Sequence, residues 1–157
     1  MGARTKYRKR ALDILFESEA QGTTTGGTLA QRLEINDPPV NAYSVHLVEG
    51  VIAHGESIDA LLTEHAKGWS LDRMPAVDRN LLRIATFEIL HEDDVPDAVA
   101  VNEAVELAKE LSTDESPSFV NGLLSRIVEV KPTLGDLAPV PAEASDDVEP
   151  SSDDTEL

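Results

Sequence analysis

The 157-residue sequence contains no cysteine, and only 4% of its residues are aromatic. Without cysteine the chain can form no disulfide, no thiolate zinc site and no cysteine nucleophile, and this composition fits a reducing compartment. No apolar run approaches the length of a bilayer span, and the basic start is followed by a mixed segment rather than by the apolar core of a signal peptide. We therefore expect a cytoplasmic protein without membrane association.

The common short motifs of enzymes are also missing. There is no GxSxG nucleophile elbow, no GxxxxGK[ST] phosphate loop and no GxGxxG after a strand. The four histidines form neither an i, i+4 pair nor an HExxH motif, and the acidic cluster at 92–97 lacks the glycine and terminal glutamate of a calcium loop. We predict no catalytic residue, no metal site and no cofactor, and we expect that the chain is not an enzyme.

Charge is distributed unevenly along the chain. The net charge of −17 would by itself argue against binding of nucleic acid, because such binding depends on basic side chains. Eight of the thirty acidic residues, however, lie between Asp136 and Glu156. Five of the thirteen basic residues lie within the first ten positions, which contain no acid: Arg4, Lys6, Arg8, Lys9 and Arg10.

Apolar residues recur at helical spacing through most of the chain, and we find no alternating strand pattern bounded by hairpin turns. The sequence therefore predicts an all-α fold of six or seven helices within residues 1–134. Residues 135–157 are rich in proline, serine, alanine and acids and contain no aromatic side chain. Such a composition cannot bury enough apolar surface to offset its ordering entropy, so we predict a disordered acidic tail.

Local signals suggest where helices begin and end. Thr5 is the predicted N-cap of a first helix that Gly22 terminates. A longer helical stretch is predicted from about 42 to 66, in which Gly50 and Gly55 mark close packing or a kink. A later helix, over roughly residues 99–111, is predicted to turn three glutamates largely toward solvent: Glu103, Glu106 and Glu110.

The basic cluster at the N-terminus supports two interpretations. A charged terminus is often only solvated and frayed. This cluster is dense, contains the aromatic Tyr7 and leads into a helix, and these features favour a binding function. Arginine and tyrosine side chains can stack on unpaired bases, and basic side chains can bind phosphates. We therefore predict that the arm from Arg4 to Arg10 contacts single-stranded RNA.

Four sequence blocks in the second half of the chain occur in a recognisable order. They are P-x-x-D-R-x-x-L-R-x-A at 75–85, D-V-P at 94–96, N-E-A-V-E-L-A-K at 102–109 and F-V-N-G-x-L at 119–124. Together with a looser match in R-x-x-A-L-D-I-L-F at 8–16, they make the chain similar to the NusB family of bacterial transcription antitermination factors. The resemblance covers about residues 4–130. It implies two small helical bundles, here about 5–66 and 70–131.

The resemblance also implies a function. Members of this family bind boxA RNA in ribosomal RNA leaders together with the ribosomal protein NusE, and they help to assemble an RNA polymerase complex that resists termination. Transferred residue by residue, the resemblance adds four candidate RNA contacts to the basic arm: Phe16, Glu115, Phe119 and Asn121. Phe16 stands where some members have tyrosine, and Glu115 where many have aspartate. Core packing is the alternative for Phe119.

Asp78 and Arg79 are the candidates for the NusE-facing surface, with an ion pair within the chain as the alternative. Two other functions stay open. The chain could be a homodimeric interaction protein that covers its own RNA surface, because some relatives self-associate. It could also be the NusB-type domain of a ribosomal RNA methyltransferase, although no residues remain after Lys131 for a nucleotide-binding α/β domain.

Overall fold

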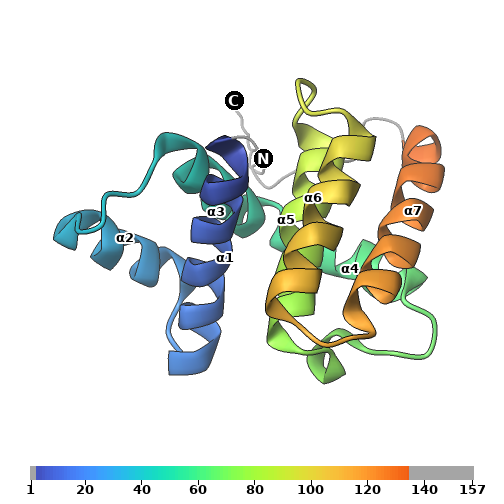
Figure 1. Cartoon of the computed structure of the whole chain (residues 1–157), viewed down its shortest axis with the longest axis horizontal. Coiled ribbons are helices and arrows are strands. Elements are labelled where there is room, and N and C mark those ends of the chain that lie inside the picture. The colour runs from blue at the N-terminus through green and yellow to red at the C-terminus, as the bar shows by residue number, and fades with distance from the viewer. Residues whose placement is uncertain (1–2, 135–157) are drawn as a thin grey trace, which may run out of the picture.

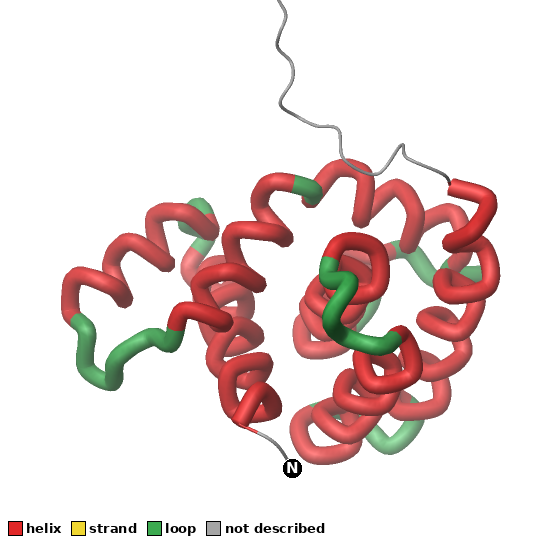
Figure 2. The backbone as a smooth tube through the Cα atoms, turned by 90° about the horizontal axis from the view of Figure 1, so that it is seen from above, coloured by secondary structure: helices red, strands yellow, loops and turns green. Residues whose placement is uncertain are grey.

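The computed structural model describes residues 3–134, and the predicted acidic tail at 135–157 lies outside the described residues. Within 3–134 the chain forms seven α-helices, one short 3-10 helix and no strand (Figures 1 and 2), which confirms the predicted all-α fold. None of these helices has the length and apolar character that a membrane span requires. The elements are α1 (Ala3–Gln21), α2 (Thr25–Ile35), α3 (Ala42–Ala53), α4 (Gly55–His65), η1 (Leu71–Arg73), α5 (Ala76–His91), α6 (Asp97–Leu111) and α7 (Ser116–Leu134).

The helices pack in two groups that meet at α5. Helix α1 contacts α2, α3 and α5, whereas α5, α6 and α7 pack against one another (Figure 1). Helix α4 also contacts α5 and α7, so it packs with the second group although the sequence assigned it to the first bundle. A single hydrophobic core runs through both groups, from Ile14 on α1 to Ile127 on α7. The position of α1 relative to α5 and α6 is therefore fixed by core packing.

Helix α1 begins earlier than the sequence predicted. It starts at Ala3, so Thr5 lies inside the helix and is not its N-cap. The helix ends as expected, because Gly22 adopts a φ of +67°, a conformation that favours glycine. The next helix has a conventional start, since the side chain of Thr24 accepts a hydrogen bond from the backbone N–H of Gly27. The basic arm is thus the first turns of a long helix.

The predicted helical stretch at 42–66 consists of two helices that change direction at His54 (Figure 1). Gly55 begins α4 directly after this break. Gly50 lies on α3 where the ring of Phe87 packs, and a Cβ added at Gly50 would lie 2.2 Å from Cζ of that ring. Both glycines therefore act as predicted, one at a close helix contact and the other at a kink.

Histidine and phenylalanine rings gather where α3 meets α5. His91 stacks on His54 with ring centroids 3.9 Å apart, and the ring centroid of Phe87 lies 5.5 Å from that of His91. The Nε2 atom of His91 is buried and makes no hydrogen bond within residues 3–134. Burial disfavours the charged ring, and His54 adds electrostatic repulsion, so the pKa of His91 falls from 6.5 to about 4.

The lowered pKa of His91 predicts a pH-dependent contribution to stability. The unfolded chain takes up a proton near pH 6.5, whereas the folded chain does so only near pH 4. The stability that neutral His91 contributes is therefore complete above pH 6.5 and is lost as the pH falls from 6.5 to about 4. Because several carboxylates titrate in the same pH range, the effect of His91 is isolated by comparing a variant without this histidine with the unchanged protein. His91→Phe should lose about 2 kcal/mol less free energy of unfolding than the unchanged protein between pH 7 and pH 4.5 in urea titrations. Equal losses in the two proteins would contradict this assignment.

Candidate nucleic-acid interface

The five cations of α1 point in different directions. Residues four apart share a helix face, so Arg4 and Arg8 form one row, and Lys6 and Arg10 form another. The first row faces α5, α6 and the connection between them, as the ion pairs of Arg4 and Arg8 show. Arg10 lies toward the α2–α3 connection and donates from Nη2 to the carbonyl oxygen of Pro38 at 3.3 Å. The basic cluster therefore does not form one continuous cationic face.

Arg8 is the innermost of these cations. The residue is only 5% exposed, and its Nε lies 3.0 and 2.9 Å from the two carboxylate oxygens of Glu88. Its Nη1 lies 3.4 Å from Oε1 of Glu103. Burial alone would lower the pKa of Arg8, but the hydrogen bond and the charge of Glu88 outweigh it and the pKa is raised. The prediction that Arg8 contacts RNA is therefore corrected: its guanidinium is buried and joins α1 to α5 and α6.

Arg4, Lys6 and Lys9 are more accessible than Arg8. Arg4 pairs with Asp94 at 3.2 Å, and Lys9 pairs with Glu110 at 2.8 Å. Surface ion pairs of this kind contribute only about 0–1 kcal/mol, so an RNA phosphate can replace either carboxylate. Lys6 is exposed and has no ion-pair partner among residues 3–134. Of these three side chains, Lys6 is an unpaired cation among the described residues, and Arg4 and Lys9 are held by exchangeable partners.

Two aromatic candidates lie on α1 with these cations. Phe16 is 43% exposed and follows Lys9 by seven residues, which places both on the same helix face. Tyr7 is half-buried, and its carbonyl oxygen accepts a hydrogen bond from the hydroxyl of Ser44 at 2.8 Å. Of the two side chains, Phe16 has the larger exposed surface on which an unpaired base could stack.

The remaining RNA candidates lie on α7 or just before it, on the other side of α6 from α1 (Figure 1). Phe119 is half-buried, and its ring packs edge-on against Trp69 with centroids 4.9 Å apart. Glu115 is exposed in the turn just before α7, and Asn121 is exposed beside the groove between α6 and α7. The structure therefore divides the predicted RNA residues into an α1 cluster and an α7 cluster.

Asp78 and Arg79, the predicted partner-facing residues, make contacts within the chain. Asp78 is fully buried and accepts hydrogen bonds from the hydroxyls of Ser112 and Ser116, so the prediction that it faces a partner is wrong. Arg79 pairs with Glu19 and also donates to the backbone carbonyls of the α4–α5 connection. The alternative of an intrachain ion pair thus holds for Arg79, although its partner is not the neighbouring Asp78.

Sequence reasoning missed the acidic partners of the arm. Glu103 was expected to face solvent, but its carboxylate accepts a hydrogen bond from the hydroxyl of Thr5 at 2.7 Å and forms an ion pair with the guanidinium of Arg8. The sequence nevertheless contained a signal for Glu88, because this acidic residue lies between the apolar Phe87 and Ile89. A carboxylate among buried apolar residues requires a cationic partner.

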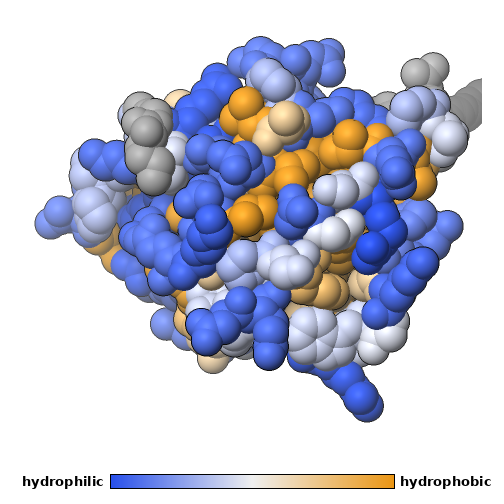
Figure 3. Space-filling view, turned by 45° about the vertical axis from the view of Figure 1, so that its right-hand side comes forward, coloured by the Kyte–Doolittle hydropathy of each residue, from blue (hydrophilic) through white to orange (hydrophobic). Residues whose placement is uncertain are grey.

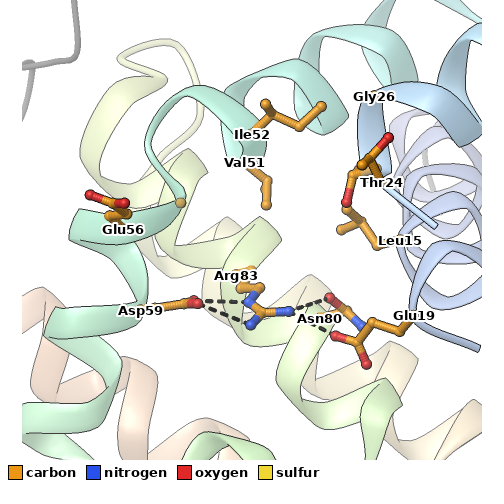
Figure 4. Close-up of a pocket in the computed structure, with 12 residues that line it drawn as sticks. Leu15, Glu19, Thr24, Gly26, Val51, Ile52, Glu56, Asp59, Asn80 and Arg83 are labelled. Atoms are coloured by element: carbon orange, nitrogen blue, oxygen red, sulfur yellow. Dashed lines mark hydrogen bonds and ion pairs between the residues drawn. The ribbon is translucent and has the colours of Figure 1, made fainter. Parts of the chain in front are cut away.

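Two further hollows lie outside the α1 cluster. One, of about 450 Å³, is bordered by Arg83, whose donors are engaged by Asp59, Glu19 and Asn80 (Figure 4), so this guanidinium is not free for a ligand. The other is a groove of about 720 Å³ between α6 and α7. Figure 3 shows apolar surface surrounded by polar side chains on the side of the molecule where these helices lie. Neither hollow presents an unpaired cation.

The NusB family model matches residues 5–129. The chain belongs to the NusB family. Among its relatives, a transcription antitermination protein NusB from Kineococcus radiotolerans is 58% identical over 134 residues, which cover 85% of this chain and 98% of that protein. The protein of the same name from Saccharopolyspora erythraea is 57% identical over 132 residues, which cover 83% of this chain and 89% of that protein.

Solved NusB structures share the fold. NusB from T. maritima superposes with a TM-score of 0.72 at 31% identity and covers 88% of this chain and 94% of its own. A crystal structure of the antitermination factors NusB and NusE in complex with dsRNA gives a TM-score of 0.70 at 26% identity, with 81% of this chain and 96% of that chain covered. The family membership inferred from the four sequence blocks is confirmed.

Proposed function

We infer that this protein is a non-catalytic transcription antitermination factor. It binds boxA RNA of ribosomal leader transcripts together with the ribosomal protein NusE, and it helps to assemble a processive RNA polymerase complex in the cytoplasm. The observation that carries this inference is the high identity to transcription antitermination proteins over almost their whole length. These relatives consist of little more than the domain described here, which speaks against a methyltransferase that carries a NusB-type domain.

The charges of the molecule support a function in which a partner strengthens the RNA contact. The acidic body repels RNA, and two of the accessible cations of α1, Arg4 and Lys9, already pair with carboxylates from the α5–α6 connection and from α6. RNA must therefore displace these carboxylates or rely on a partner that supplies positive surface. We expect boxA affinity to be weak for the protein alone and to rise when NusE is added.

Lys6 provides the sharpest test of the RNA contact on α1. Lys6→Ala should weaken binding of boxA RNA about three- to tenfold at low salt, and it should reduce the slope of log K against log salt by about one. The loss should be similar for boxA and for a scrambled RNA, because a phosphate contact does not read sequence. Fluorescence anisotropy over a salt series, with and without NusE, measures both quantities.

A matched control for this variant is Lys131→Ala. It removes the same charge from α7, where Lys131 pairs with Asp97 at 3.0 Å. The control should leave RNA affinity almost unchanged. Equal effects of the two substitutions would indicate that only net charge matters, and wild-type binding that ignored both sequence and salt would contradict the proposed function.

The homodimer alternative makes a different prediction. If a second copy covered α1, RNA binding would weaken as the protein concentration rises, and RNA would shift the protein toward monomer. Sedimentation velocity at several concentrations, with and without boxA RNA, separates this case from a monomer whose RNA affinity is independent of protein concentration.

A further inference from the structure

A small cavity opens beside the first turns of α1. It has a volume of about 390 Å³ and lies between α1, the α5–α6 connection and the start of α6. One wall is apolar and consists of Val95, Pro96 and Val99. The opposite wall carries the polar side chains of Thr5 and Arg8. A cavity with an apolar wall and convergent polar groups beside an RNA-binding helix has the character of a ligand site.

Val99 makes the apolar wall accessible. Its residue is 42% exposed, whereas Ala100, Ala104 and Ala108 on the same helix are buried in the core. A valine left exposed at the mouth of a cavity presents apolar surface against which a flat ring can pack. The ring need not disturb the core to enter, because the cavity is already open in the protein alone.

Glu103 supplies an acceptor for a hydrogen bond. Its side chain is only 18% exposed. The Oε1 atom accepts a hydrogen bond from the hydroxyl of Thr5 at 2.7 Å and lies 3.4 Å from Nη1 of Arg8. No donor within residues 3–134 reaches Oε2 of this carboxylate. Carboxylates accept hydrogen bonds from the amino groups of bases, and they offer nothing to a carbonyl oxygen.

Arg4 supplies a cation at the rim of the cavity. Its guanidinium lies 4.3 Å from the ring centroid of Tyr43, which holds it in place by a cation–π contact. Its partner Asp94 has a side chain that is 64% exposed, so this ion pair is weak and an RNA phosphate can take the position of the carboxylate.

We propose that this cavity binds one unpaired RNA base that carries an exocyclic amino group, and that it thereby distinguishes cytosine from uracil. The amino group donates to Oε2 of Glu103, the ring packs against Val99 and Pro96, and the adjoining phosphate contacts Arg4. Uracil would place a carbonyl oxygen against the carboxylate where cytosine places its amino group. The inference rests on the proposed RNA-binding function and adds a base preference to it.

Short oligocytidylate and oligouridylate of equal length test this proposal with the full chain. We expect the protein to bind oligocytidylate about tenfold more tightly at the same salt concentration, the lower end of the discrimination that a base-edge contact provides. Val99→Trp, which fills the cavity from an exposed position, should abolish the preference. Glu103→Gln should reduce it, because an amide can pair with either base. Glu106→Gln removes the same charge from an exposed position on the same helix and should leave the preference intact.

A second measurement avoids any effect of substitution on folding. In methyl NMR spectra of the unchanged protein, oligocytidylate should shift the signals of Val99 more than oligouridylate does. Equal shifts, or a preference that survives both Val99→Trp and Glu103→Gln, would overturn the proposal. Binding of boxA RNA over a scrambled control is measured in parallel. If that binding persists while the base preference is absent, only the cavity assignment fails, and if it is lost, both proposals fail.

Discussion

Arg8→Ala should lower the free energy of unfolding by about 3–5 kcal/mol, the range observed when one partner of a buried ion pair is removed. The substitution leaves Glu88, which is 1% exposed, without its cationic partner in the core. The hydroxyl of Tyr43 also donates to Glu88, but one neutral donor cannot compensate for a guanidinium that contacts both carboxylate oxygens. Urea denaturation monitored by circular dichroism measures the loss.

Lys6→Ala is the matched control for Arg8→Ala, because it removes a cation from the same helix at an exposed position without an ion pair. Its free energy of unfolding should change by less than about 0.5 kcal/mol. Replacing both partners, as in Arg8→Met with Glu88→Leu, should recover much of the loss, because apolar residues often substitute for a buried ion pair without net cost. Similar stabilities of Arg8→Ala and Lys6→Ala would show that Arg8 is not the buried anchor described here.

Asp78→Ala should cost about 3 kcal/mol of stability, because two serine hydroxyls would lose their charged acceptor. The hydroxyl of Ser116 donates to Oδ2 of Asp78 at 2.8 Å, and the hydroxyl of Ser112 donates to Oδ1. Hydrogen bonds to charged groups contribute about 1.5–3 kcal/mol each, and the two share one carboxylate. Amide hydrogen exchange should accelerate first in the turn between α6 and α7, which these bonds hold to α5.

Asp114→Ala provides the control for this turn. Asp114 is exposed in the same segment, and its loss should leave both stability and exchange nearly unchanged. The pair of variants also tests the partner-facing interpretation. Were Asp78 a direct NusE contact, Asp78→Ala would weaken NusE binding while the protein stayed as stable as the Asp114→Ala control.

Helical periodicity was sufficient to predict the fold class and the ends of several helices, because apolar spacing reports directly which face a helix buries. Gly22 was recognisable as a terminator because few other residues adopt its backbone conformation. The start of α1 could not be predicted in the same way. Thr5 resembles an N-cap locally, but its hydroxyl donates to a glutamate nearly a hundred positions away, and no local pattern records that contact.

The candidate site was predictable only in part for a related reason. The sequence showed where the basic residues are concentrated, yet it could not show which of them have partners. Arg8 and Lys6 look equivalent in the sequence, and only the packing of α5 and α6 against α1 buries one and leaves the other exposed. Charge counts along a chain describe the unfolded polymer, whereas pairing depends on contacts between distant segments.

Gly50 lets the two groups of helices pack closely because it has no side chain. Glycine in the middle of a helix costs about 1 kcal/mol relative to alanine, mostly in backbone entropy, so α3 in isolation would be a better helix with alanine at this position. In the folded protein that alanine would collide with the ring of Phe87, which reaches across from α5. Gly50 thus weakens α3 as an isolated helix, but it allows α3 and α5 to pack closely and so holds the two groups of helices together.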